Sequence, residues 1–155
     1  MAQVFAQHFQ RALGWLAPEF AADAPPIERL RHLYFQAALS LREQVPWVTR
    51  MMIDCADNVA TAQQSMQDLV LREFHIVRQM VREIAPQLSD EQAMQAISQM
   101  QTSILLPILT ANTFSRIGVV PDELRQPILQ QLTDDALAQR VDWIIKALFS
   151  AEETR

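Results

Sequence analysis

The chain has very little glycine and cysteine, and each shortage excludes a class of structure. Two glycines in 155 residues leave few positions for the tight turns of β-hairpins, and the many alanine, leucine, glutamine, arginine and methionine residues favour helices. One cysteine, Cys55, cannot form an internal disulfide. A buried free thiol is the more common situation for such a residue than a reactive one. The composition predicts an all-helical chain without disulfides.

An excess of positive charge and long apolar runs are also missing. The net charge is -5, whereas binding to nucleic-acid phosphates needs clustered Lys and Arg. The longest apolar run, residues 104–109, is interrupted by Pro107 and falls far short of the ~20 residues of a membrane span. The N-terminus also lacks the pattern of a signal peptide. We therefore expect a cytoplasmic protein that contacts neither DNA nor the membrane directly.

Hydrophobic residues make up half of the chain, which is the balance of a globular protein. Its length suits a single domain over residues 1–155. Helical spacing of apolar residues, divided by prolines and capping residues, predicts six main helices and one short helix arranged as a bundle. The main helices are expected at 3–17, 26–46, 47–55, 61–84, 90–114 and 134–148, with the short one between 121 and 132.

Several helix boundaries have specific signals. Proline is tolerated only in the first turn of a helix, so Pro46 is expected to end one helix and begin the next. Ser89 followed by Gln92 at the third position is the signature of a capping box. The next helix is expected to kink at Pro107 and to stop at Gly118.

The helix expected at 61–84 carries a wide apolar arc, which predicts neighbours on two sides. One face holds Met66, Val70, Phe74, Val77, Val81 and Ile84, and Leu69, Ile76 and Met80 flank it. On the remaining surface, Arg72, Arg78 and Arg82 with His75 can form a small anion site. The interspersed Glu73 and Glu83 favour a solvated face of mixed charge instead.

No pattern of catalytic or metal-binding residues is present in the sequence. Glu73 and His75 point in different directions on one helix, and the three histidines lie on three different expected helices, so neither a di-iron site nor a zinc site is predicted. A nucleophile elbow, a Walker loop, a dinucleotide-binding fingerprint and a CxxC pair are all missing. We expect no enzyme activity, no cofactor and no metal, so the function is sought in binding.

Methionine and aromatic residues suit a pocket for apolar ligands of variable shape, because methionine is flexible and polarisable. The same spacing fits an ordinary core, and the pattern alone favours the core. The residues concerned are Trp47, Met51, Met52, Phe74, Met80 and Met100.

The order of elements resembles the C-terminal regulatory domain of TetR-family transcriptional repressors over essentially the whole chain. The resemblance is carried by DAPPIERLRHLYFQAAL, VPWVTRMMI, the long helix at 61–84, SDEQAMQAISQMQTSILLPILTANTFSRIGV and LTDDALAQRVDWIIKALFSA. Members of that family begin with a helix-turn-helix domain, and no recognition helix is present in this sequence. The chain is then either a regulatory fragment of a longer repressor or a protein that lost its DNA-binding domain.

The resemblance implies a ligand cavity among the first five helices that takes a small hydrophobic effector. Tyr34 and Gln101 are the expected polar anchors, and Trp47 is expected to form a flat wall. The full set of expected ligand-binding residues is Phe9, Leu13, Tyr34, Trp47, Met51, Phe74, Gln101 and Ile104.

The resemblance also implies a homodimer in which the fifth and last helices form a four-helix interface with a second copy. The periodicity of the residues concerned fits either a core within one chain or a self-complementary interface, and the apolar content of the two helices favours the interface. They are Ile97, Ile104, Ile108, Leu137, Val141, Ile144 and Leu148.

Three functions remain open at this point. The first is the effector-binding and dimerisation domain of a TetR-family regulator, which contacts DNA only through an upstream helix-turn-helix domain. The second is a stand-alone helical protein that forms heterodimers with an intact repressor. The third is a small helical lipid carrier or enzyme that uses the same cavity.

Overall fold

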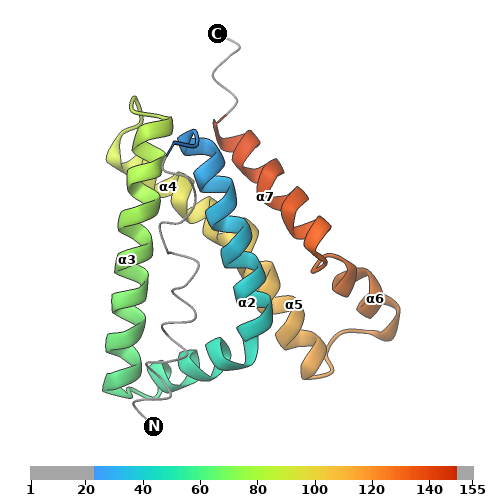
Figure 1. Cartoon of the computed structure of the whole chain (residues 1–155). Helices are drawn as coiled ribbons and strands as arrows, with labels where there is room; N and C mark the ends of the chain where they lie inside the picture. The colour runs from blue at the N-terminus through green and yellow to red at the C-terminus, as the bar shows by residue number, and fades with distance from the viewer. Residues whose placement is uncertain (1–22, 150–155) are drawn as a thin grey trace.

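The computed structural model describes residues 23–149, and all regular elements within that range are helical, as predicted (Figure 1). The helix expected at 3–17 lies outside the described residues. Among the described helices, none has the length and apolar character needed to cross a membrane. The elements are α2 (Pro26–Ala56), α3 (Ala60–Ile84), α4 (Asp90–Met100), the π-helical segment η2 (Gln101–Leu105), α5 (Leu106–Arg116), α6 (Asp122–Gln130) and α7 (Asp134–Phe149).

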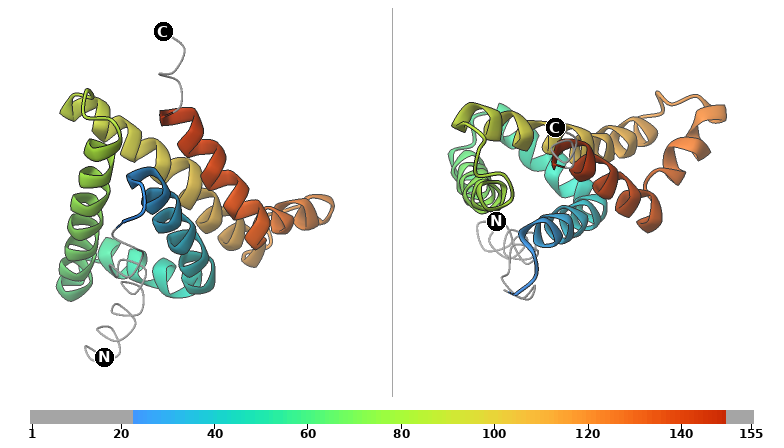
Figure 2. Two further views of the ribbon diagram at one scale, coloured as in Figure 1. Left: turned by 45° about the horizontal axis from the view of Figure 1, so that its top comes forward. Right: turned by 90° about the horizontal axis from the view of Figure 1, so that it is seen from above.

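Helix α2 occupies the centre of this arrangement and packs against α3, α5 and α7 (Figures 1 and 2). Its apolar face therefore has neighbours on several sides, and the side chains of these helices meet in one core. The core includes Leu30, Tyr34, Ala38 and Val45 of α2, Val77 and Val81 of α3, Met100, Ile104 and Ile108 of the α4–α5 run, and Leu137, Val141 and Ile145 of α7.

The prediction that Pro46 separates two helices is wrong. Residues 26–56 form one helical element with Pro46 inside it, and the helix bends sharply part-way along its length (Figure 1). Proline lacks the amide hydrogen that would bond to the carbonyl of Arg42, and its ring crowds that carbonyl. A helix relieves both problems by bending, so the chain continues as a helix in a new direction.

The buried face of α3 is rotated relative to the predicted one. Val70 is 55% exposed, whereas Ala62, Val77 and Val81 are buried. The face turned inward therefore passes through Leu69 and its neighbours on the helix surface, because residues three and four apart lie on one side. The expected helix boundaries, residues 61–84, agree with the observed ones to one residue.

The capping box that begins α4 is confirmed. The Ser89 hydroxyl accepts a hydrogen bond from the Gln92 amide at 3.2 Å, and the Gln92 side chain accepts one from the Ser89 amide at 2.9 Å. These two bonds satisfy backbone donors that have no partner within the helix. The sequence therefore fixes where the chain turns from α3 into α4.

The irregularity expected at Pro107 lies in the turn before it. Residues 101–105 form the π-helical segment η2, and the amide of Leu106 donates to the carbonyl of Gln101, five residues earlier. Because Pro107 cannot donate to the carbonyl of Ser103, a widened turn ahead of the proline is a physically reasonable response. Helix α5 then ends at Arg116, and Gly118 follows with a φ of 74°, as expected for a C-terminal stop.

Polar contacts attach α7 to α2. The guanidinium of Arg42 donates to the carbonyl of Leu132 at 2.7 Å and to the carboxylate of Asp134 at 2.6 Å. Arg31 forms a second ion pair with Asp142 at 3.3 Å. These contacts hold the start and the middle of α7 in register with α2 while the apolar face of α7 provides most of the packing.

The residues expected at a dimer interface are largely buried within one chain. Five of them belong to the core, and the other two, Ile144 and Leu148, are partly buried against it. Their periodicity is therefore accounted for by packing within the chain. The buried members are Ile97, Ile104, Ile108, Leu137 and Val141. A homodimer thus stays a prediction, and its interface needs contacts beyond the five residues that are buried within one chain.

Candidate functional site

An apolar cavity of about 120 Å³ lies between α2 and α3. Both halves of the bent helix α2 contribute to it, α3 forms the facing wall, and η2 adds one residue. The lining consists of Ala37, Ser40, Leu41, Gln44, Trp47, Val48 and Met51 of α2, Met66, Leu69 and Glu73 of α3, and Leu105 of η2.

The bend in α2 gives this cavity its shape. Residues before Pro46, such as Ala37 and Leu41, form one wall, and Trp47 and Met51 after the bend form another. A straight helix would carry the second group away from α3. The proline in the sequence therefore has a structural consequence at this site as well as in the helix itself.

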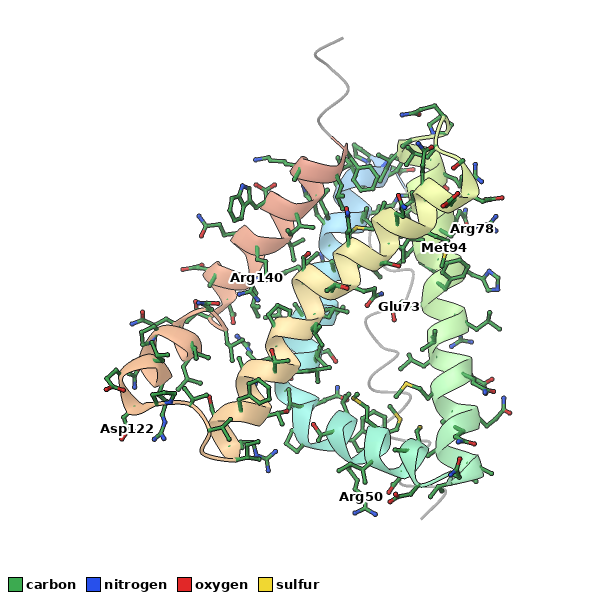
Figure 3. All side chains as sticks on the ribbon, turned by 180° about the vertical axis from the view of Figure 1, so that it is seen from behind. Arg50, Glu73, Arg78, Met94, Asp122 and Arg140 are labelled. Atoms are coloured by element: carbon green, nitrogen blue, oxygen red, sulfur yellow. The ribbon has the colours of Figure 1, made fainter. Side chains whose placement is uncertain are left out.

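Among the described residues that line the cavity, Glu73 is the only one with an ionisable side chain. It lies on the side of α3 that faces the α4–α5 run (Figure 3). The Gln101 side chain donates to its carboxylate at 2.5 Å, and within residues 23–149 no cationic group pairs with it. Burial raises the pKa of Glu73 above its usual range, and the hydrogen bond from Gln101 partly opposes that shift.

Two more polar groups near Glu73 have unused hydrogen-bonding capacity. The hydroxyl of Tyr34 is buried and has no hydrogen bond of normal geometry within the described residues. Burial and the charge of Glu73 raise the pKa of Tyr34, and the nearby Gln101 amide acts in the opposite direction. Gln44 donates to the Ser40 hydroxyl at 2.9 Å, but its buried side-chain oxygen has no partner in residues 23–149.

The structure brings together some of the residues expected to bind a ligand. Trp47 and Met51 line the cavity, and Tyr34 and Gln101 lie with Glu73 at its polar side. The two expected polar anchors are thus in one place.

Other expected residues lie elsewhere. Ile104 belongs to the core, and Phe74 packs against that core beside His75, with ring centroids 6.0 Å apart. Neither of them lines the cavity. Phe9 and Leu13 fall outside the described residues. The predicted ligand set is therefore divided between the cavity, its polar side and the general core.

Glu73 was missed by the sequence prediction, although the sequence contains a signal for it. Met66, Leu69, Glu73, Val77 and Met80 follow one another at spacings of three and four residues. That spacing puts a carboxylate in the middle of an apolar stripe, where a charged group is unusual. The sequence prediction instead places Glu73 on a solvated face of mixed charge, because it alternates there with arginines.

The arginine-rich surface of α3 is a face of mixed charge, as the sequence favoured. Arg78 and Arg82 both donate to the carboxylate of Asp90, which follows the turn into α4, and the Arg78 contact is 2.8 Å long. These arginines hold the pKa of Asp90 below its usual range. Both guanidinium groups are already engaged with this one carboxylate, so they do not form an open anion site.

A second, more open hollow of about 640 Å³ lies along α7. Trp143, whose side chain is 75% exposed, forms part of it together with Arg140 and Lys146. Arg140 lies on α7, on a different part of the molecule from Glu73 (Figure 3). The two hollows are therefore separate features with different chemistry, one apolar with a single carboxylate and the other mixed.

The chain matches no family model, no curated protein and no solved structure. The resemblance to TetR regulatory domains therefore stays a prediction from the sequence alone. Chemically, residues 23–149 contain no group of three or more His, Cys, Asp or Glu side chains placed to hold a metal ion. The arrangement that remains is a small apolar cavity with a polar side.

Proposed function

We propose that this chain is the effector-binding and dimerisation domain of a TetR-type transcriptional regulator, with DNA contacted by a helix-turn-helix domain outside this sequence. The observation that carries the proposal is the cavity beside the bend of α2, with Tyr34 and Gln101 at its polar side. Ligand sites are typically concave and apolar with a few polar groups that fix orientation.

The size of the cavity suits a small ligand or the buried part of a larger one. At about 120 Å³ it is close to the ~150 Å³ apolar cavity that accommodates benzene in another protein. A ligand here contacts both halves of α2, α3 and η2 at once. If it binds one arrangement of these helices better than another, it shifts the equilibrium between them, and that difference in affinity is what a sensor uses.

The proposed dimer has support on the surface of α7. Trp143 is strongly exposed, and the hollow along α7 lies directly beside it. A protruding tryptophan next to a hollow makes one patch complementary to itself, as a two-fold symmetric interface requires. Tryptophan is also among the residues that contribute most at protein interfaces.

Filling the cavity tests the ligand-binding part of the proposal. Leu69→Trp places a larger side chain in the cavity, so we expect binding of a neutral probe such as toluene to weaken roughly tenfold or more, by loss of its apolar contacts. Binding is measured by the thermal midpoint and by the NMR signals of the Met51 and Met66 methyl groups.

Leu71→Trp is the matched control, since Leu71 is on the same helix and 57% exposed. It should bind toluene like the wild type. Equal binding by both variants, or no change in the two methionine signals of the wild type at saturating toluene, would contradict a ligand site in this cavity.

A further inference from the structure

Within the part of the chain that the structure describes, the cavity between α2 and α3 combines apolar walls with one carboxylate that has no counter-charge. Burying an ionised carboxylate is unfavourable unless it is paired, and proteins normally pair such groups with Lys or Arg. Glu73 has one neutral partner, the Gln101 amide, which satisfies part of the hydrogen-bonding capacity of the carboxylate and none of its charge.

Several cations of the surrounding helices are paired with other carboxylates, and the exposed Arg72 beside Glu73 on α3 forms no ion pair with it. Arg78 and Arg82 bind Asp90, Arg29 pairs with Glu83, and Lys146 pairs with Asp142 on α7 at 2.7 Å. The negative charge of Glu73 therefore has no match in residues 23–149. A ligand that carries a positive charge would supply it.

The other groups around the cavity fit the same kind of ligand. The buried side-chain oxygen of Gln44 is an unused acceptor, which suits the N–H donors of an ammonium group. Trp47 offers an aromatic face, and indole is the ring that attracts a cation most strongly. Leu41, Met66 and Leu69 provide walls for an apolar body next to the charge.

We propose that this cavity binds a small amphipathic amine, with the protonated nitrogen against Glu73 and the apolar body between α2 and α3. The inference rests on the proposed function of the cavity as an effector site and adds the chemical class of the effector. An anionic ligand is excluded by the same geometry, because it would place like charges together in an apolar site. A neutral apolar ligand leaves Glu73 unmatched.

The test compares ligands of equal size that differ in charge. Benzylamine is protonated at neutral pH, whereas benzyl alcohol has nearly the same shape and no charge. We expect the wild-type chain to bind benzylamine roughly tenfold more tightly than benzyl alcohol, as measured by calorimetry, with shifts of the Met51 and Met66 methyl signals for both. Glu73→Gln should remove the preference while retaining the binding of benzyl alcohol.

Asp68→Asn is the matched control, because Asp68 is an exposed acid on the same helix and its removal changes the net charge equally. It should keep the preference for the amine. Acidification gives a second readout that needs no substitution, since protonation of Glu73 should remove the preference of the wild-type chain while benzylamine stays charged.

The possible results distinguish failure of the amine preference from failure of the ligand site on which it rests. Equal affinity of the wild type for the amine and the alcohol, with both shifting the methionine signals, overturns the amine preference and leaves a ligand site. Loss of the preference in Asp68→Asn as well would show a general charge effect and would also overturn it. Failure of both ligands to shift the methionine signals overturns the inference and the ligand site together.

Discussion

Glu73 is expected to lower the stability of the free protein, and it is also the residue proposed to bind the ligand. Its carboxylate lies in an apolar cavity with a single neutral hydrogen-bond donor, and burial raises its pKa above the ordinary value of 4.5. Between the ordinary and the raised pKa, the folded state holds more protons than the unfolded state. The free energy of unfolding therefore falls as the pH rises through that range.

This linkage predicts that Glu73→Gln stabilises the free protein at neutral pH. The amide removes the cost of a buried charge and keeps the size of the side chain, so we expect a thermal midpoint about 2–4 °C higher, which corresponds to ~1 kcal/mol in a chain of this size. The midpoint of the wild type relative to the variant should fall as the pH rises above 4.5 and through the raised pKa of Glu73.

Asp68→Asn should follow the wild type across the same pH range, because that residue is exposed. The measurement is a series of calorimetric scans from acid to neutral pH. A variant whose midpoint differs from the wild type by a constant amount at every pH would show that Glu73 titrates normally. That outcome would remove the basis for treating it as an unmatched, partly buried charge.

At the residue scale, local signals in the sequence were reliable where a backbone rule applied. Ser89 and Gln92 form the expected capping box, and Gly118 has the positive φ expected after a helix end. The position of Glu73 was not recognised, because the exact rotation of α3 depends on how α2 and α4 pack against it. A carboxylate at the edge of two possible apolar stripes cannot be assigned without that information.

At the scale of the elements, the prolines decide the shape of the site. Pro46 bends α2 so that Trp47 and Met51 reach the cavity, and Pro107 follows the widened turn that contains Gln101 and Leu105. The sequence predicted an interruption at each proline. It could not distinguish a helix end from a bend, since that depends on whether the following turn packs favourably in the new direction.

Pro46→Ala tests the role of the bend. Alanine restores an amide that can bond to the carbonyl of Arg42, and it removes the ring that crowds that carbonyl, so α2 gains freedom to straighten. We expect binding of toluene in the cavity to weaken about fivefold or more, with no loss of helix content by circular dichroism, because the walls formed by Trp47 and Met51 move apart.

The control for this variant is Pro127→Ala, which removes a proline from inside α6, away from the cavity. It should leave toluene binding unchanged. If Pro46→Ala binds toluene as the wild type does, packing against α3 and α5 holds the bend, and the proline is then a consequence of the shape rather than its cause.

At the scale of the whole molecule, the open question is which surface residues could form the proposed dimer interface. Most of the periodic residues of the α4–α5 run and of α7 are buried within the chain, so a second copy must rely mainly on other side chains. Trp143 is the most exposed of the large apolar residues that the structure describes, and it adjoins the hollow along α7. The sequence could not show whether the periodic residues form the core of one chain or an interface between two copies, because both have the same helical spacing.

The proposed dimer predicts a specific effect of Trp143→Glu. The wild type should have the mass of a dimer in light scattering at micromolar concentration. The variant buries a charge at the same place and loses a large aromatic contact, so dimerisation should weaken by ~30-fold or more, which corresponds to ~2 kcal/mol. Since the side chain is exposed within one chain, the helix content of the variant should not change.

Leu124→Glu is the matched control, because Leu124 is an exposed apolar residue of α6 and receives the same substituent. It should remain a dimer. A dimeric Trp143→Glu variant would place the interface away from this surface of α7, and a monomeric wild type would contradict the homodimer itself. The ligand predictions for Glu73 concern a different surface, because the described lining of the cavity comes from α2, α3 and η2 and not from α7.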